Sequence, residues 1–342
     1  MCHPKQKALS QSLIDEDPFL YLKIEDTSIL DSIDSRRPCT KCCKSRKYFC
    51  YTCYVPVQDL QGKLPVVKLP FKIDIIKHKH EIDGKSTAIH ASILAEQDVT
   101  IYTYPDIPDY DAEDISKTVL IFPSNDALNI EQLFMKQLNS PEFQQPSLAT
   151  IPKGYNRSTL LKNRICTSNE HKIDPIAYNL DKLPIDRAVF IDSTWHQSKG
   201  IYKDDRIKRL QCVALQNRVS QFWRHQKNSP RWYLATIEAI HQFCVEMHIN
   251  AWGFNKNYYP ALQYLFYDTT FLNGKQNESN EDCLKNNDRL ESDRLNSVHS
   301  TVLPSGYNGQ YDNLLYFFKY MHGKIHLYYN HTDLQAYKRP VL

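Results

Sequence analysis

The chain has 342 residues, of which 42% are hydrophobic and 24% charged, and 42 Lys and Arg against 39 Asp and Glu give a net charge of +3 at pH 7. This length predicts one large domain with an appended module, or two domains, and it is enough to bury a sizeable core. The small net charge argues against a uniformly basic nucleic-acid binder but leaves nucleic acid open as a partner, because a basic face can lie within a nearly neutral protein.

The N-terminal stretch gives no targeting signal. Residues 1–5, MCHPK, lack the apolar core of a signal peptide, and no later segment approaches the roughly 20 apolar residues needed to span a bilayer. We therefore expect a soluble intracellular protein, nuclear or cytoplasmic or both, with no membrane partner and no obligate protein partner. Residues 1–36 are expected to form a flexible N-terminal segment.

Five of the ten cysteines lie within one short window, RPCTKCCKSRKYFCYTCYVP. Cys39/Cys42 and Cys50/Cys53 form two C-x-x-C pairs, whose four sulfurs suit tetrahedral zinc in a reducing compartment. We predict a Cys-rich zinc knuckle over residues 37–56, in which Cys43 is the alternative to Cys42. Inert or redox-labile thiols are the competing interpretation. The basic and aromatic residues interleaved with the cysteines indicate an RNA-contacting surface or a solvated loop.

Apolar runs that alternate with helical patterns follow the knuckle. We predict strands at 71–76, 118–122, 187–192 and 212–215, and helices at 86–94, 130–138, 200–210 and 237–247. Strands that alternate with helices indicate an α/β fold with a mostly parallel sheet.

A polar segment interrupts this pattern near the C-terminus. Residues 273–302 are rich in Asn, Glu, Asp and Ser and have few large apolar side chains, so they are predicted to be a disordered insertion. The apolar stretch DNLLYFFKYM at 312–321 then predicts a helix that closes the core. It belongs to a C-terminal helix and tail over 303–342.

The strand at 187–192 ends abruptly in the polar sequence IDSTWHQSK. One interpretation is that Asp192 and Thr194 cap the next helix, because short oxygen-bearing side chains accept hydrogen bonds from the free N–H groups at helix starts. The other is that a ligand binds here, since open α/β sheets bind their ligands at the carboxyl ends of strands. The local pattern alone favours capping.

Several motifs together resemble the DTW-domain family of tRNA-uridine aminocarboxypropyltransferases. IDSTW at 191–195, LATIEAI at 234–240 and FPS at 122–124 follow an upstream Cys knuckle, and FWRHQ at 222–226 matches the FWR-x-Q of the eukaryotic type. The resemblance covers roughly residues 37–265 and the helix at 312–321, with 57–272 as the DTW catalytic domain. The long insertion and the crowded cysteines depart from the family pattern.

The resemblance implies a SPOUT-like α/β domain with a knotted S-adenosylmethionine pocket. It also implies an enzyme that binds the D-arm of tRNA and transfers the 3-amino-3-carboxypropyl group of S-adenosylmethionine to N3 of a D-loop uridine, expected at tRNA position 20, giving acp3U and methylthioadenosine. A SPOUT-type methyltransferase and a non-catalytic zinc-bearing tRNA-binding protein are the alternatives.

The implied site residues fall into four groups. The catalytic candidates are Asp192, Thr194 and Trp195. The cofactor-binding candidates are Phe122, Pro123, Ser124, Asp192, Ser193, Thr194, Leu234, Thr236 and Glu238. The RNA-binding candidates are Arg206, Arg209, Arg218, Trp223, Arg224 and Arg231. The metal ligands are Cys39, Cys42, Cys50 and Cys53.

Each of three site residues has an alternative to its implied role. Asp192 is a poor base at an ordinary pKa, so burial must raise its pKa or the residue chiefly orients the uridine. Trp195 is placed to stack on a base, or it packs in the core. Glu238 binds the cofactor's amino group, or it only favours the local helix dipole.

Overall fold

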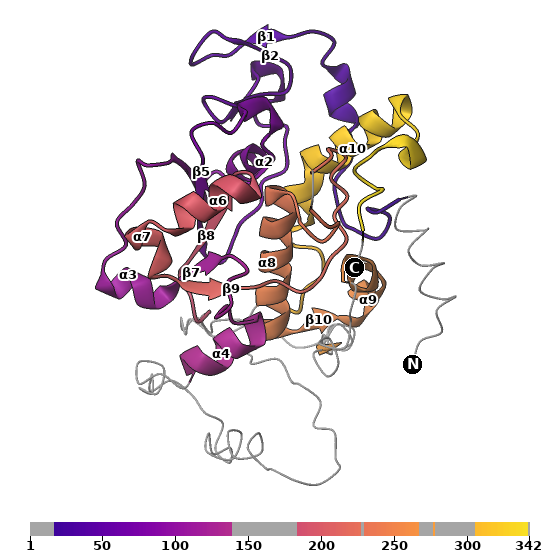
Figure 1. Ribbon diagram of the computed structural model, residues 1–342. Coiled ribbons are helices and arrows are strands. Elements are labelled where there is room, and N and C mark those ends of the chain that lie inside the picture. The colour runs from indigo at the N-terminus through magenta and orange to yellow at the C-terminus, as the bar shows by residue number, and fades with distance from the viewer. Residues whose placement is uncertain (1–16, 139–182, 227–228, 267–275, 278–304, 341–342) are drawn as a thin grey trace, which may run out of the picture.

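A computed structural model describes residues 17–138, 183–226, 229–266, 276–277 and 305–340 (Figure 1). At its centre lies a five-stranded sheet in which every neighbouring pair is parallel. The order across the sheet is β6 (Val99–Thr103), β5 (Lys72–Lys77), β8 (Arg187–Asp192), β7 (Thr118–Ile121) and β9 (Gln211–Val213). The predicted α/β class and parallel sheet are confirmed.

The strands are apolar because both faces of the sheet are covered. In β5, Ile73 and Ile75 point into the larger core on one face, whereas Ile76 points into a smaller core on the other. In β8, Ala188 and Phe190 face the larger core in the same way, and the residue between them faces the smaller one. This alternation fixes which side chains of each strand reach which layer.

Helices form the two outer layers. The larger core lies under α2 (Ala88–Leu94), α4 (Ile130–Leu138), α8 (Thr236–Trp252), η8 (Asp312–Leu315) and α10 (Tyr316–Tyr328). The smaller core lies under α3 (Ala112–Lys117), α6 (Trp195–Tyr202) and α7 (Asp205–Lys208). Helix α8 runs through the middle of the molecule (Figure 1), and nearly all of its residues are buried. An all-round buried helix of this kind organises the core rather than a surface.

Two short hairpins form the Cys-rich segment, β1 (Arg37–Pro38) with β2 (Ser45–Arg46) and β3 (Phe49–Cys50) with β4 (Val55–Pro56), followed by η2 (Gln58–Leu60). The segment packs on the main domain, since the ring of Phe49 lies against His90 of α2 and Phe317 of α10.

Residues 17–36 belong to the N-terminal segment 1–36 that was expected to be flexible, and in the structure they pack on the C-terminal helices. Phe19, Leu30 and Ile33 are buried in the larger core, and Leu30 lies within η1 (Ser28–Ser32). The backbone N–H of Lys23 donates to Asp312 at 2.7 Å. Phe19 and Leu30 belong to no sustained helical or strand pattern in the sequence, so their burial depends on tertiary contacts. Residues 1–16 lie outside the described part.

The remaining described elements follow α8. They are β10 (Phe254–Asn255), η5 (Lys256–Tyr258), α9 (Tyr259–Leu265), β11 (Gln276–Asn277), η9 (His331–Asp333) and, earlier in the chain, η3 (Asp83–Lys85). Most of the predicted insertion 273–302 lies outside the described residues; Gln276–Asn277 pair with β10. Among the helices described here, none has the length and apolar character that a membrane crossing requires.

Candidate active site

The strand order places a topological switch point, which we call the crevice, between β5 and β8. The chain leaves β5 for β6 on one side and leaves β8 for β9 on the other, so the connections after these adjacent strands diverge. Such a switch point is where open α/β sheets bind ligands. Asp192 is the last residue of β8 and pairs in register with Lys77, the last residue of β5.

The carboxylate of Asp192 joins three parts of the chain. One oxygen accepts a hydrogen bond of 2.7 Å from the hydroxyl of Ser86, before α2, and the other accepts one of 2.6 Å from the hydroxyl of Thr236, at the start of α8. Asp192 is only 4% exposed. Burial raises the pKa of its carboxyl, and the two hydroxyl donors and Lys77 oppose that rise. A carboxyl with a raised pKa is a better proton acceptor than an ordinary aspartate.

Thr194 confirms the capping interpretation for its own side chain. It is the N-cap of α6, and its hydroxyl accepts from the Gln197 backbone while the Gln197 side chain accepts from the Thr194 N–H, which makes a complete capping box. Ser193 donates to the Thr194 carbonyl. Asp192, by contrast, caps no helix in this way, because both of its oxygens accept from hydroxyl groups.

Trp195 lies at the meeting point of the predicted cofactor loops. Its ring centroid lies 4.3 Å from that of Tyr233, beside Leu234, and 6.3 Å from that of Phe122. Phe122 stacks on Tyr202 of α6, and Ser124 donates to Asp126 within its own loop. Trp195 is partly exposed, as are Phe122 and Leu234, whereas Pro123 is exposed. The structure therefore brings the 122–124, 192–195 and 234–236 motifs together.

Glu238 is placed differently from the prediction. It is fully buried, and its carboxylate accepts from the Ser220 hydroxyl and from the backbone N–H groups of Gln221 and Ala235 at 2.7–2.8 Å. Its oxygens thus hold the loop before α8 against the helix start. This use of both oxygens inside the protein argues against direct contact with a cofactor.

Lys77 is a site residue that sequence reasoning missed. Its side chain is only 11% exposed, and its ammonium group forms an ion pair of 2.6 Å with Asp83. Tyr54, from the second Cys hairpin, also interacts with this ammonium group. A lysine at the end of an apolar strand is common on surfaces, and only the β5–β8 register reveals that this one faces Asp192.

The predicted RNA-binding residues separate into three kinds. Arg218 and Arg231 are buried, at 5% and 3% exposure, which argues against their predicted contact with RNA phosphates. Arg218 donates to His241, whose other ring nitrogen lies 3.0 Å from a buried Asp312 oxygen, and Arg231 lies over the ring of Tyr337. An arginine of such a network contacts protein rather than nucleic acid.

The other candidates lie nearer the surface. Arg206 and Arg209 bind carbonyls of the 105–110 loop and pair with Asp204 and Asp109 respectively. Trp223 packs against Phe222 and Phe318.

Arg224 borders the crevice itself. One of its terminal nitrogens donates to the Gly84 carbonyl at 3.3 Å, in the loop that carries Ser86. The other, Nη1, is buried and has no hydrogen-bond partner among the described residues. A buried guanidinium nitrogen without a partner is costly, so this position is suited to an anionic group of a ligand.

The cysteine cluster has the geometry of a metal site. The sulfurs of Cys39, Cys42, Cys50 and Cys53 all lie within 4.8 Å of one another, one C-x-x-C from the turn of each hairpin. The residue after each pair, Cys43 or Tyr54, has positive φ, and its N–H bonds back to the first cysteine's carbonyl. The two turns are therefore built alike.

Donors to sulfur complete this cluster. The guanidinium of Arg46 lies 3.3 Å from the Cys50 sulfur, and the Cys53 N–H lies 3.4 Å from it. Burial raises the pKa of the Cys50 thiol, but these donors and the N–H of Thr52 outweigh it and lower the pKa overall. Cys43 is exposed and outside the cluster, so the structure selects Cys42 of the two alternatives.

The fold and this site define an α/β protein with a candidate ligand site at the carboxyl edge of a parallel sheet and a four-cysteine cluster that could hold a metal ion. The chain belongs to the DTW domain family, whose match spans residues 47–326.

Similar proteins carry one shared name, tRNA-uridine aminocarboxypropyltransferase 1. The protein of that name from Xenopus tropicalis is 40% identical over 66% of this chain and 76% of its own length. The Mus musculus protein is 33% identical over 94% of this chain and 88% of its own, and the Homo sapiens protein 33% over 93% and 86%. No solved structure is similar at a significant level.

Proposed function

We propose that this protein is a tRNA-uridine aminocarboxypropyltransferase that modifies N3 of a D-loop uridine, with S-adenosylmethionine as co-substrate. The observation that carries the proposal is the position of Asp192, buried at the switch point between β5 and β8 with the three family motifs gathered around it. The name shared by relatives that match most of the chain supports the reaction class.

The reaction exchanges one bond for another. A bond forms between N3 of the uridine and the γ-carbon of the 3-amino-3-carboxypropyl group, and the bond from that carbon to sulfur breaks. Methylthioadenosine leaves with the bonding electron pair, and the N3 proton must pass to a base. The co-substrate supplies a carbon activated by the sulfonium, and the pocket selects this carbon over the methyl carbon by orientation.

Asp192 is the proposed proton acceptor, reached through the hydroxyl of Thr236. Thr236 is partly exposed, and its hydroxyl donates to the carboxylate at 2.6 Å. This hydroxyl can accept the N3 proton while it passes its own proton to Asp192, which is itself too buried to contact the uridine. Lys77 faces the same carboxylate and favours its ionised form. Asp192 also orients Ser86 and Thr236, which fixes both walls of the crevice.

The residues around Trp195 are proposed to form the cofactor pocket. The rings of Phe122, Trp195 and Tyr233 provide an apolar wall for the adenine and for the methyl group that must be kept away from the nucleophile. The Nη1 of Arg224, which has no hydrogen-bond partner within the described part of the chain, provides a position for a carboxylate or a phosphate. We further propose that this part of the sheet is SPOUT-like and that the pocket is knotted; the all-parallel order with non-sequential neighbours is consistent with such a path.

We propose zinc as the metal of the four-cysteine cluster, because zinc prefers tetrahedral thiolate ligands and needs no further group in a structural site. The surface of the knuckle is proposed to contact the D-arm of tRNA. The protein is proposed to act in the nucleus, the cytoplasm or both.

The experiment is a reaction of purified protein with tRNA transcripts and S-adenosylmethionine. Nucleoside mass spectrometry should show acp3U, and equal amounts of methylthioadenosine should appear. Formation of S-adenosylhomocysteine instead of methylthioadenosine would show that the protein is a methyltransferase. Binding of tRNA with neither by-product formed would instead assign a non-catalytic tRNA-binding protein.

A further inference from the structure

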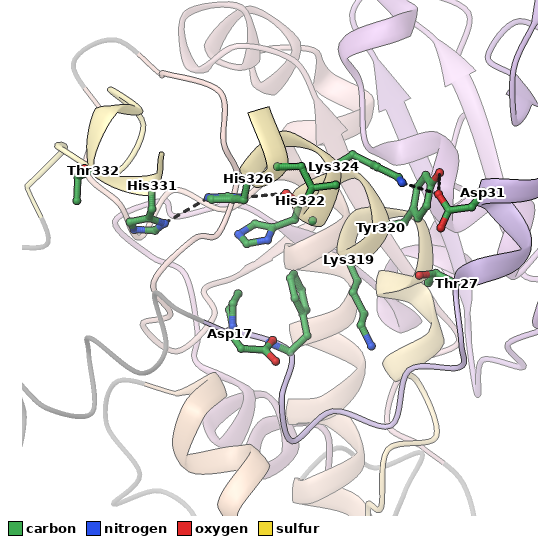
Figure 2. Close-up of a pocket in the computed structure, with 14 residues that line it drawn as sticks. Asp17, Thr27, Asp31, Lys319, Tyr320, His322, Lys324, His326, His331 and Thr332 are labelled. Carbon is green, nitrogen blue, oxygen red and sulfur yellow. Dashed lines mark hydrogen bonds and ion pairs between the residues drawn. The ribbon is translucent and has the colours of Figure 1, made fainter. Parts of the chain in front are cut away.

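A pocket of about 720 Å³ lies between the N-terminal segment, η1 and α10 (Figure 2). We name it the α10 groove; it is lined, among others, by Phe19, Lys319, His322, Lys324, His326 and His331. None of its lining residues belongs to the crevice around Asp192 or to the cysteine cluster. It therefore requires an explanation of its own.

His322 carries a buried, unpartnered nitrogen in the wall of this groove, among the described residues. The residue is only 6% exposed and lines the pocket, yet its Nε2 has no hydrogen-bond partner among the described residues. Buried polar atoms are nearly always paired, so a lone nitrogen in a pocket wall marks a place for a ligand atom. Burial lowers the pKa of the ring to about 3, which leaves it neutral. A neutral imidazole offers a hydrogen bond rather than a charge.

The histidines beside it form a group of stacked rings, which we call the imidazole platform. The ring of His326 stacks on His322 at 4.0 Å, and His331 stacks on Tyr337 at 3.9 Å with planes only 9° apart. The platform is fixed by hydrogen bonds, from His326 Nδ1 to the His322 carbonyl at 2.8 Å and between His331 Nδ1 and His326 Nε2 at 3.3 Å (Figure 2). Planar rings held in place in this way are surfaces on which nucleobases stack.

Cationic and exposed aromatic residues continue the surface. Lys319 and Lys324 lie on the same helix, which ends at Tyr328; Tyr328 and the next residue, Tyr329, are 80% and 56% exposed. Exposed aromatic residues next to lysines are typical of single-stranded nucleic-acid binding and have no role in the core. This surface supplies the basic and aromatic pairing that was expected of the buried Arg218 and Arg231.

The groove is continuous with the Cys-rich segment. The hydroxyl of Tyr48, in the loop between the two hairpins, lies 3.0 Å from that of Tyr320 on α10. Asp31 joins them, since it accepts from Tyr320 and pairs with Lys324 at 2.5 Å. One surface thus runs from the knuckle to the end of α10.

We propose that the α10 groove binds a single-stranded nucleotide segment of the tRNA substrate. A base would stack on the imidazole platform and bond to His322 Nε2, and the adjoining phosphates would lie at Lys319 and Lys324. The inference rests on the proposed function, because it takes tRNA as the substrate. It concerns RNA docking and assigns no step of the chemistry to these residues.

The test uses the full chain and fluorescence-labelled tRNA at several salt concentrations. The double variant Lys319→Ala/Lys324→Ala should weaken binding about tenfold and reduce the slope of log Kd against log salt by one to two, roughly one per lost phosphate contact. His322→Phe keeps a planar aromatic ring but removes Nε2, so it should weaken binding with little change in slope. Lys68→Ala, at an exposed lysine outside the groove, is the matched control.

Turnover separates this inference from the proposed function. At saturating tRNA the lysine variant should keep the wild-type kcat and show a raised KM. Wild-type affinity and slope in that variant would overturn the groove proposal even if acp3U is formed. If the lysine variant binds tRNA more weakly but the wild-type protein forms no acp3U, the groove proposal would stand and the proposed enzymatic function would be rejected.

Two further arms address folding and the ligand source. If His322→Phe unfolds, the lysine variant alone still tests the proposal. Both lysine side chains lie at the surface, so their replacement by Ala should leave the protein folded. Calorimetry with uridine monophosphate distinguishes free nucleotide from tRNA. Binding of that nucleotide at the groove with no change in tRNA affinity would overturn the proposal.

Discussion

Asp192, at the end of β8, accepts a hydrogen bond of 2.6 Å from Thr236, 44 residues further along the chain at the start of α8. We predict that Asp192→Asn keeps S-adenosylmethionine and tRNA affinity within a few-fold, because the amide keeps the shape of the carboxyl. The variant should lose transfer by about 10²–10⁴ fold, the contribution typical of a general base. Single-turnover formation of acp3U checks this.

Thr236 provides the matched control for that experiment. Thr236→Ser keeps the hydroxyl and should retain most of the rate, whereas Thr236→Val removes it and should approach the rate of Asp192→Asn. Full activity of Asp192→Asn would remove Asp192 from proton transfer.

The pH dependence of the reaction should report Asp192. Burial raises the pKa of this carboxyl above its ordinary value of 3.8, while the hydroxyl donors and Lys77 oppose the rise. Because the ionised form accepts the proton, kcat/KM should fall as the pH is lowered through the raised pKa. Lys77→Met removes the opposing charge, so the acid limb should move to higher pH. An unmoved limb in Lys77→Met would show that Lys77 does not act on Asp192.

Metal analysis should find one zinc per chain after mild purification. Cys50→Ser removes a ligand and should abolish zinc binding and lower the thermal midpoint, because a structural zinc site contributes directly to folding. Cys43→Ser should retain the metal, since Cys43 is exposed and lies outside the cluster. Zinc retained in Cys50→Ser but lost in Cys43→Ser would reverse the ligand assignment.

Local sequence patterns were sufficient for the strands that carry the site. β8 lies at 187–192 as predicted, and β5 and β7 differ from the predicted bounds by one residue at most at each end. Their apolar runs are continuous because both faces are covered. β6 was missed: only its first residue is buried, so Val99–Thr103 lacks a continuous apolar run and leads directly into a proline-containing loop.

The partners of the site residues could not be predicted. Ser86 lies 106 positions before Asp192, and only the sheet order brings the two together. The burial of the charged residues could not be predicted from the sequence either. Glu238 and Arg218 are buried by contacts with distant segments, and a single sequence does not distinguish such an arginine from one that faces RNA.

Arg218 gives the clearest test of that last distinction. It is buried beside His241, which bonds to Asp312, and Tyr307 donates to the same carboxylate at 2.7 Å. Arg218→Met leaves this network without its cation, and removing one member of a buried charge network typically costs about 3–5 kcal/mol. Urea unfolding should show a loss of that order, and Arg209→Ala, at a partly exposed ion pair, should cost under about 1 kcal/mol. The salt dependence of tRNA binding should stay at the wild-type slope in whatever fraction of Arg218→Met remains folded. A stable Arg218→Met protein with a reduced slope would return Arg218 to the RNA-binding surface.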